Sequence, residues 1–415
     1  MVNISKRFKN TYFFWVFIFI TGMISCKNGT AFKTENIAQG PDAFKALTIE
    51  KIQIAGPRDY LNEIKGKKVA IVANQTSVVE SEYGSYTHLV DTLLSLHIDI
   101  QNVFAPEHGF RGQADAGEDV FDSKDVRTGL PVISLHGKNR KPTVDQLRHV
   151  DLVIFDIQDV GVRFYTYLST LHYVMEACAE NKVPLMLIDR PNPNAAYIDG
   201  PVLEPEFKSF LGLHPVPIVY GMTIGEYAKM INGEQWLKNG IQCNLKVMEL
   251  KNYTHSTPYS IPIKPSPNLP NDKAINLYPS LGLFEGTSIN IGRGTDMQFQ
   301  LFGAPFLSAD SFPFTYTPVS KPGAKDPKFK DKICHGLDLR NEPELNFINL
   351  DWLIEAYKAT PKDQEFFQAT FIHHAGTDAL QKQIEAGKTA EEIKAGWQTG
   401  LDDFKKVREK YLIYN

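Results

Sequence analysis

Short apolar runs alternate with amphipathic stretches through the first half of the chain. The amphipathic stretches, such as His88–Leu96 and Leu168–Ala179, repeat their apolar residues with the period of a helix. The apolar runs are unbroken, which is typical of strands buried on both faces. Strands and helices that alternate in this way predict an α/β fold with a Rossmann-like, mostly parallel, doubly wound sheet. We expect its strands at 68–73, 102–105, 131–135, 152–155 and 184–188.

This alternation breaks after about residue 200. Prolines crowd 201–217 and 258–279, which indicates irregular loops and a crossing between domains. At 415 residues the chain also exceeds what one core usually supports. We therefore predict a Rossmann-like domain at 46–260 and an additional C-terminal α+β domain at 261–415. Within the second domain we expect helices at 350–358 and 390–411.

Three of the predicted strands end in charged and polar residues. The carboxyl ends of parallel strands meet at one edge of a sheet, where open α/β sheets bind their ligands. We therefore expect these side chains to converge, although they are far apart in sequence. The three groups are Glu107, His108 and Arg111; Asp156, Asp159, Arg163, Tyr165 and Tyr167; and Asp189, Arg190 and Asn192.

Carboxylates beside arginines and tyrosines are typical of a site that grips a sugar and cleaves its glycosidic bond. Such a site needs one protonated carboxyl group and one ionised carboxylate. Glu107 is the predicted acid, because its apolar neighbours Phe104 and Phe110 favour the neutral form. Asp159 and Asp156 are the candidates for the second carboxylate, with Asp159 preferred.

Structural alternatives exist for each of these residues. Glu107 could instead pair with Arg111, and an aspartate that follows a strand often caps the next helix. Asp189 and Arg190 could form a local ion pair rather than bind substrate.

Composition and motifs exclude several other functions. A net charge of -4 gives no basic face for nucleic acid. No glycine-rich dinucleotide turn follows the first strand, and no G-x-S-x-G hydrolase turn occurs. The histidines, including the adjacent His373 and His374, lack the spacing of metal ligands, so we expect them to be surface or core residues. We predict neither a metal nor a cofactor.

The N-terminus has the features of an export signal. Lys6, Arg7 and Lys9 precede the short apolar segment Tyr12–Ile20, and small residues lead to Cys26. We predict a signal peptide at 1–26 with a lipobox-like cysteine, followed by a polar tether at 27–45. Lipidation of Cys26 would make the protein an exported, membrane-anchored lipoprotein facing the periplasm or cell envelope. The alternative is an ordinary secretory signal and a soluble secreted or periplasmic protein.

Several of these stretches resemble the NamZ-type exo-β-N-acetylmuramidases, formerly a domain family of unknown function. The resemblance covers nearly everything beyond about residue 50. It is carried by Phe104–Gly112, Phe155–Tyr167, Asp189–Pro193, Glu285–Thr287, Gly292–Asp296 and the end of the chain at 411–414. It implies a Rossmann-like domain, a C-terminal domain and a cleft between them. It also implies release of N-acetylmuramic acid from the non-reducing end of peptidoglycan fragments, with Glu107 at the position of a proposed catalytic glutamate.

The implied substrate also suggests binding roles. Muramic acid carries a lactyl carboxylate, which a buried arginine can hold through two hydrogen bonds. Arg163 and Arg293 are the candidates, since each lies in a loop that contains glycine. A lipid-anchored, non-catalytic binding protein for wall sugars is the alternative, although clustered carboxylates favour an enzyme. The residues predicted to bind substrate are His108, Arg111, Arg163, Tyr165, Tyr167, Asp189, Arg190, Asn192, Glu285 and Arg293.

Overall fold

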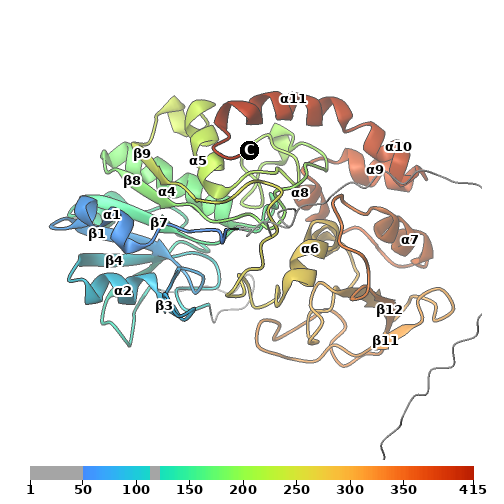
Figure 1. Cartoon of the computed structure of the whole chain (residues 1–415). Helices are drawn as coiled ribbons and strands as arrows, with labels where there is room; N and C mark the ends of the chain where they lie inside the picture. Colours follow the sequence, from blue (N-terminus) through green and yellow to red (C-terminus); the bar gives the residue numbers. More distant parts are fainter. Residues whose placement is uncertain (1–49, 113–121) are drawn as a thin grey trace, which may run out of the picture. The chain divides into compact units, whose positions relative to one another are not determined.

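A seven-stranded sheet organises the first part of the protein (Figure 1). The structure is a computed structural model that describes residues 50–112 and 122–415. The strand order is β5-β6-β4-β1-β7-β8-β9, and every neighbouring pair is parallel except β5 with β6. The strands are β1 (Lys68–Ala73), β4 (Asp99–Ala105), β5 (Ser123–Lys124), β6 (Pro131–Ser134), β7 (Leu152–Asp156), β8 (Leu185–Ile188) and β9 (Leu245–Met248).

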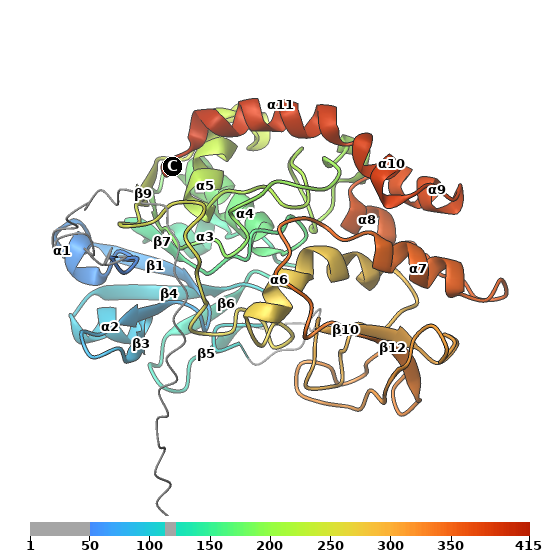
Figure 2. The same ribbon diagram turned by 45° about the vertical axis from the view of Figure 1, so that its right-hand side comes forward.

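Helices cover both faces of this sheet (Figure 2). One face packs against α1 (Pro57–Ile64) and α2 (Leu89–Ser95). The other packs against α3 (Val144–Leu147), α4 (Tyr167–Asn181) and α5 (Ile224–Gly233). A short hairpin of β2 (Val78–Glu80) and β3 (Tyr86–His88) lies between β1 and α2 in the chain. The predicted doubly wound α/β sheet is confirmed.

The two-sided burial follows from the side chains of the central strands. In β1, Val69 and Ile71 join the core under α1 and α2, whereas Ala70 and Val72 join the core under α4 and α5. All of them are buried, as the unbroken apolar run predicts. Neighbouring β7 alternates in the same way.

The C-terminal part has a small sheet and helices of its own. Its antiparallel sheet has the order β10-β12-β11. The same apolar cluster that underlies α4 continues into this part through Leu277, Phe284 and Leu353. The elements are α6 (Asp272–Leu281), the 3-10 helix η3 (Gly282–Gly286), β10 (Leu301–Ala304), β11 (Phe314–Tyr316), β12 (Cys334–Asp338), α7 (Asp351–Ala359), α8 (Phe371–Ala375), α9 (Ala379–Glu385), α10 (Ala390–Ala395) and α11 (Gln398–Arg408). The boundary predicted between residues 260 and 261 stays a prediction.

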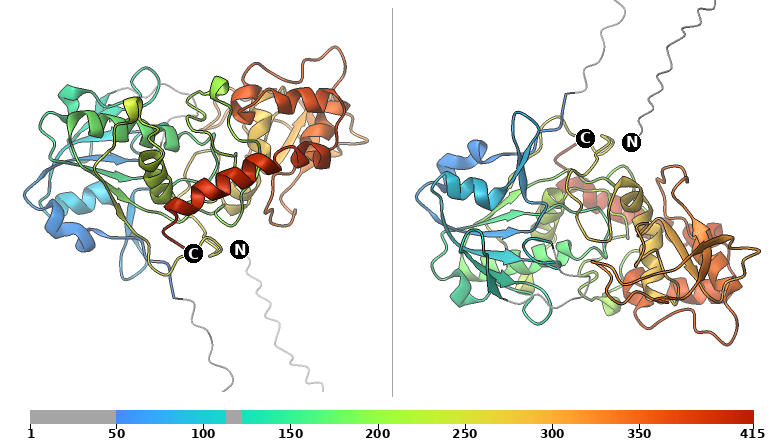
Figure 3. Two further views of the ribbon diagram at one scale, coloured as in Figure 1. Left: turned by 90° about the horizontal axis from the view of Figure 1, so that it is seen from above. Right: turned by 90° about the horizontal axis from the view of Figure 1, so that it is seen from below.

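The last helix returns the chain to the first part. Seen from above, α11 runs back from the C-terminal helices toward α5 (Figure 3). At its end, the Arg408 guanidinium donates to the Gly221 carbonyl, with Nε at 2.8 Å. The final residues therefore pack beside the sheet rather than beside β10–β12.

Two expectations about helices were wrong. The helix predicted over 390–411 is two helices, because α10 ends before Gly396 and α11 begins at Gln398. The proline-rich stretch 258–279, predicted to be irregular, contains most of α6. Asn271 caps that helix by accepting from the Ala274 N–H at 2.9 Å, and Pro279 lies inside it.

Candidate functional site

Glu107 lies in the turn after β4, at the carboxyl edge of the sheet. The Thr166 hydroxyl donates to Oε2 of Glu107 over 2.7 Å, and Thr166 is the residue that precedes α4. The side chain is partly buried. Two of the predicted groups, the turn after β4 and the connection from β7 to α4, therefore meet at this edge.

Three buried tyrosines lie close together, and two of them, Tyr167 and Tyr278, are within electrostatic reach of Glu107. The rings of Tyr165 and Tyr167 are 4.6 Å apart, and Tyr165 lies 6.0 Å from Tyr278 of α6. Burial raises the pKa of Tyr278, and the charges of Glu285, Glu107 and Asp159 raise it further, while Arg293 opposes them. Tyr278 thus lies within electrostatic reach of all four charged residues, which come from both parts of the chain.

Asp159 is buried within electrostatic reach of these tyrosines. Its Oδ2 accepts from the Tyr220 hydroxyl and from the Gly161 N–H, the latter at 2.7 Å. Its Oδ1 is buried without a partner among the described residues. Burial raises the pKa of Asp159 to about 6, although the Tyr220 and Gly161 hydrogen bonds oppose the shift. This carboxyl group can therefore change its charge near neutral pH.

Asp156 has a different environment, because it forms a buried ion pair with Arg190. The two contacts are Nε to Oδ1 at 2.6 Å and Nη2 to Oδ2 at 3.0 Å. Arg190 also donates to the Val78 carbonyl at 3.1 Å. Both carboxylate oxygens are occupied, which favours a structural role for Asp156 and Arg190 over the predicted catalytic and substrate-binding roles.

Asp189 holds the end of the chain. It accepts from the hydroxyls of Thr223 and Tyr414, both at 2.7 Å, and from the Gly225 N–H at 2.8 Å. Burial raises its pKa to about 6. Asn192, also predicted to bind substrate, donates to the Met222 carbonyl at 2.8 Å.

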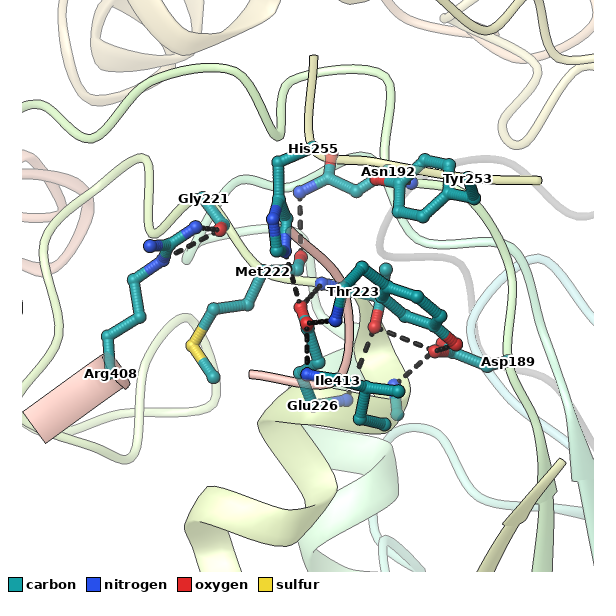
Figure 4. A network of polar contacts seen from close by, with 12 residues as sticks. Asp189, Asn192, Gly221, Met222, Thr223, Glu226, Tyr253, His255, Arg408 and Ile413 are labelled. Atoms are coloured by element: carbon teal, nitrogen blue, oxygen red, sulfur yellow. Dashed lines mark hydrogen bonds and ion pairs between the residues drawn. The ribbon is translucent and has the colours of Figure 1, made fainter. Parts of the chain in front are cut away.

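Figure 4 shows the network around these residues, in which Glu226 accepts from Thr223, His255 and Ile413. These contacts give Asp189 and Asn192 a structural role.

Arg163 is also structural in this arrangement. It is buried, and its Nη1 and Nη2 donate to four backbone carbonyls at 2.7–3.1 Å. Burial lowers its pKa to about 9. Both terminal nitrogens are occupied, so we no longer propose Arg163 as a reader of the substrate carboxylate. The four acceptors are the carbonyls of Pro201, Val216, His374 and Ala375.

Arg111 and His108 are the remaining residues of the first group. Arg111 pairs with Asp125, with Nη2 to Oδ2 at 2.9 Å, and stacks over the Phe110 ring. It does not pair with Glu107 in the contacts of the described residues, contrary to the structural alternative. His108 is buried and has a positive φ of 71°. A substrate role for His108 stays a prediction.

Glu285 and Arg293 line a cavity of about 440 Å³ in the C-terminal part. The Arg293 guanidinium donates to Glu285 and lies 5.3 Å from the Phe299 ring. Burial alone would raise the pKa of Glu285, but Arg293 and His374 lower it to about 2. The carboxylate therefore stays ionised. The segment 323–328 also lines the cavity.

Lys328 joins that segment to the Glu285 loop. Its ammonium group donates to the carbonyls of Glu285, at 3.1 Å, and Thr287. Burial lowers the pKa of Lys328 to about 8, against the opposing charge of Glu285. Arg293 and Lys328 bring positive charge to a cavity that Glu285 and Asp326 also line, and guanidinium and ammonium groups are the usual partners of an anionic ligand.

Sequence reasoning missed four residues of this arrangement. Tyr278 lies in a proline-rich stretch that predicted a loop, and His374 had no ligand spacing. Tyr220 and Lys328 carried no signal, because their importance depends on contacts with Asp159 and Glu285 across the fold.

Nowhere in 50–112 or 122–415 do three His, Cys, Asp or Glu side chains come close enough together to hold a metal ion. Within the same residues, every helix is too short or too polar to cross a bilayer. Cys26 and the predicted signal peptide and tether lie outside the described residues.

Carboxylates and tyrosines at a sheet edge, within electrostatic reach of an arginine-lined cavity, fit an α/β glycosidase, and the comparisons with known proteins show that class. The chain belongs to the NamZ family of exo-β-N-acetylmuramidases. The model of the NamZ N-terminal domain matches residues 69–273, and that of the C-terminal domain matches 276–414. Since this identifies an enzyme, the alternative of a non-catalytic binding protein is set aside.

Individual relatives support the same assignment. The chain is 37% identical over 418 residues to the peptidoglycan β-N-acetylmuramidase NamZ of Bacillus subtilis strain 168, covering 96% of this chain and 99% of that protein. A DUF1343 family protein of Bacteroides fragilis has 43% identity and a TM-score of 0.81, covering 88% of this chain and 99% of its own. A second DUF1343 protein of that organism has 28% identity and a TM-score of 0.72, covering 86% and 97%.

Proposed function

We propose that this protein is an exo-acting glycosidase that releases N-acetylmuramic acid from the non-reducing end of peptidoglycan fragments. The observation that carries the proposal is the grouping of Glu107, Tyr278 and Arg293 within mutual electrostatic reach. The printed activity of the Bacillus subtilis relative, a peptidoglycan β-N-acetylmuramidase, supports the substrate class. In this proposal, substrate binds in a cleft between the sheet and the C-terminal part.

Glu107 acts as the general acid in this proposal. It protonates the glycosidic oxygen while the bond to the anomeric carbon breaks, so that the leaving sugar departs as a neutral alcohol. Water forms the new bond to the anomeric carbon and gives up a proton to solvent, which releases N-acetylmuramic acid, and Glu107 is protonated again from solvent. The Thr166 hydroxyl holds one of its oxygens, which restricts the carboxyl group to one orientation. The family resemblance of Phe104–Gly112 supports the same residue.

Asp159 supplies the second carboxylate. It is ionised in most molecules at neutral pH, since its pKa is about 6. Its charge reaches Tyr165, Tyr167 and Tyr278. We propose that it acts through this field, stabilising the positive charge that develops on the sugar ring.

Arg293 reads the lactyl carboxylate of the terminal sugar. Among the described residues its only hydrogen-bond acceptor is Glu285, so its other N–H groups are available for a ligand. Tyr165 and Tyr167 form the floor beside the acid, where their hydroxyls donate to the Pro265 carbonyl at 2.8 Å and 3.2 Å. In this proposal the residues that cleave the bond lie at the sheet edge, and the residue that selects the substrate lies in the C-terminal part.

The proposed site of action is the cell-wall side of a membrane. A basic start, a short apolar segment and Cys26 support export and lipid anchoring. A lipid-anchored enzyme there meets peptidoglycan fragments during wall turnover.

A pair of disaccharides tests the function. The purified protein should release N-acetylmuramic acid from a disaccharide that has this sugar at its non-reducing end, and from a chromogenic N-acetylmuramic acid glycoside. The disaccharide with N-acetylglucosamine at that end should stay intact. Cleavage of the second disaccharide, or release of internal fragments from long glycan chains before any monosaccharide, would contradict the proposal.

A further inference from the structure

Three partly exposed rings form a group that the site described above does not include. The rings of Tyr173 and Phe210 are nearly parallel, with an angle of 13° between their planes and 6.3 Å between their centroids. The His136 ring lies 6.4 Å from the Phe210 ring. None of the three side chains is fully buried. We call these three residues the aromatic platform.

Helix α4 connects the aromatic platform to Glu107. The hydroxyl of Thr166, at the N-cap of α4, donates to Glu107, and Tyr173 follows Thr166 by seven residues. Residues seven apart lie on the same face of a helix, about 10 Å apart along its axis. Every residue of Tyr167–Cys178 is buried except Tyr173. The helix therefore reaches the surface at the platform, on the face that also contacts the proposed acid.

The sheet places His136 near the same residue. Strands β4 and β6 are parallel neighbours, and Ala105 at the end of β4 pairs with Ser134 at the end of β6. Glu107 and His136 each follow two residues after these paired positions. Because neighbouring strands lie about 4.8 Å apart, the two turns are adjacent at the carboxyl edge of the sheet. A helix face and a strand pair thus lead independently from the acid to the platform.

Phe210 is held in place by its own turn. Ser209 and Gly212 exchange two backbone hydrogen bonds of 3.0 Å, which close a tight turn around Phe210. The Ser169 hydroxyl donates to the Phe210 carbonyl at 2.8 Å, which attaches this turn to α4. A ring that is already fixed in position binds a ligand at little cost in conformational entropy.

We propose that the aromatic platform binds the sugar on the leaving side of the scissile bond. The faces of aromatic rings are negative and attract the C–H groups of a pyranose ring. The Arg140 guanidinium lies over the Phe210 ring, with Cζ 4.4 Å from its centroid, and supplies N–H donors for sugar oxygens. Rings beside such donors suit a neutral N-acetylhexosamine.

The inference rests on the proposed function, because a leaving side exists only if Glu107 protonates a glycosidic oxygen. It adds a second binding site to that proposal. Arg293 acts on the sugar that is released, whereas the aromatic platform acts on the sugar that remains with the rest of the fragment.

Two muramyl substrates test the inference. One is the disaccharide with N-acetylmuramic acid at its non-reducing end, and the other is the methyl glycoside of N-acetylmuramic acid. Both have an alcohol as leaving group, so both need the acid, but only the disaccharide has a leaving ring for the platform to bind. Phe210→Ala should lower kcat/KM about tenfold on the disaccharide and hardly change it on the methyl glycoside.

Three further variants define the effect. Tyr173→Ala should also lower kcat/KM selectively on the disaccharide. Phe210→Tyr keeps an aromatic ring and should keep the wild-type ratio of kcat/KM for the two substrates. Phe207→Ala is the matched control, because it removes another partly exposed phenylalanine from the same stretch of chain and should also keep the ratio.

Binding of N-acetylglucosamine, measured by NMR titration, examines the platform without turnover. The wild type should bind this sugar, and Phe210→Ala should raise the dissociation constant about tenfold. Phe207→Ala should bind it like the wild type.

The outcomes separate this inference from the proposed function. An equal loss on both substrates for Phe210→Ala would show that the ring only supports the fold, and would overturn the inference. If the wild type cleaves the disaccharide and Phe210→Ala keeps the wild-type ratio, the proposed function stands and the inference fails. If the wild type binds N-acetylglucosamine through Phe210 but cleaves neither substrate, a sugar site at the platform stands and the proposed function fails.

Discussion

At the scale of single residues, Glu107 and Asp159 are held in contrasting ways. Glu107 is partly buried and accepts a hydrogen bond from the Thr166 hydroxyl, which orients a carboxyl group that is still partly exposed to a substrate. Asp159 is buried and receives a hydroxyl and a backbone N–H, so it acts by its charge. Such a difference in environment is how two carboxyl groups of one site take different roles.

Glu107→Gln tests the acid. The amide keeps the shape but cannot donate the proton, so the rate on the natural disaccharide should fall by about 100-fold or more. A nitrophenyl glycoside, whose leaving group departs as an anion, should lose much less. Steady-state kinetics on both substrates measure the difference. An equal loss on both substrates would show that Glu107 is not the acid.

Asp159→Asn should separate stability from activity. Because burial raises the pKa of Asp159 from 3.8 to about 6, the stability it provides is complete below pH 3.8 and is lost as pH rises to about 6. The amide of the variant carries no charge, so this loss does not occur. At pH 7.5 the free energy of unfolding of the variant should therefore be about 2 kcal/mol higher than that of the wild type. Its activity should fall on both substrates, because the charge acts on the sugar ring.

Asp156→Asn is the contrasting control for this measurement. It leaves the Arg190 charge buried and unpaired, and should lower stability by about 3 kcal/mol. Chemical denaturation at pH 4 and pH 7.5 distinguishes the two variants. A less stable Asp159→Asn protein at pH 7.5 would contradict the assignment of a strained, buried charge.

Arg293→Ala addresses substrate selectivity. Loss of a charge-assisted contact should cost about 2–4 kcal/mol of binding free energy on a muramyl substrate and much less on the N-acetylglucosaminyl analogue. The ratio of kcat/KM for the two substrates is the measurement. Equal losses on both sugars would remove this role from Arg293.

Which of these residues could be predicted depends on what the sequence contains. The apolar runs predict where the strands end, so Glu107 and Asp159 were identified as edge residues. The partners of those residues were not predictable, because Asp156 meets Arg190, and Arg163 meets α8, only in the folded chain. The position of a charged residue after a strand therefore predicted that it lies near the site. It did not predict whether another residue of the protein already pairs with that charge.

At the scale of elements, the pattern of apolar and polar residues predicted the strands of the sheet well and the elements of the C-terminal part much less well. Strands buried on both faces are unbroken apolar runs, which can be recognised from the sequence alone. In contrast, α6 contains a proline and follows a proline-rich loop, and its stability comes from the Asn271 cap and from buried residues such as Leu277 and Tyr278. Packing with distant residues, rather than local propensity, maintains this helix.

The end of the chain provides a prediction at this scale. The Tyr414 hydroxyl donates to Asp189 at 2.7 Å and accepts from the Leu250 N–H at 2.9 Å. Tyr414→Phe leaves both groups without this partner and should lower stability by about 2 kcal/mol. Because the hydroxyl supports the ionised form of Asp189, the loss should be larger at pH 8 than at pH 5.

Tyr411→Phe is the matched control, since the Tyr411 hydroxyl bonds to Glu234 near the surface. It should cost less than about 1 kcal/mol, with little dependence on pH. Thermal unfolding of the two variants at both pH values makes the comparison. Equal, small effects of both substitutions would contradict an anchoring role for Tyr414.

At the scale of the whole molecule, one apolar cluster continues from the α4 face of the sheet into the C-terminal part. Arg163 reinforces this continuity, because one guanidinium group bonds to carbonyls at 201 and 216 and to carbonyls of α8. The sheet edge and the arginine-lined cavity are therefore parts of one packed unit. No local sequence pattern could predict this, since the contacts join residues about 200 positions apart.

Lipid attachment at Cys26 is the remaining prediction at the scale of the whole molecule. A basic start, an apolar segment and a cysteine at the expected cleavage site motivate it. In a bacterial host, the wild type should sediment with membranes and incorporate a labelled fatty acid. Cys26→Ala should remain unlabelled and enter the soluble fraction with unchanged activity, because the site is built from residues far beyond the tether. Ser25→Ala, which keeps the cysteine, is the control and should behave as the wild type. If Cys26→Ala stays with the membranes to the same extent, the anchor is not a lipid on this residue, and ordinary secretion or another attachment must be considered instead.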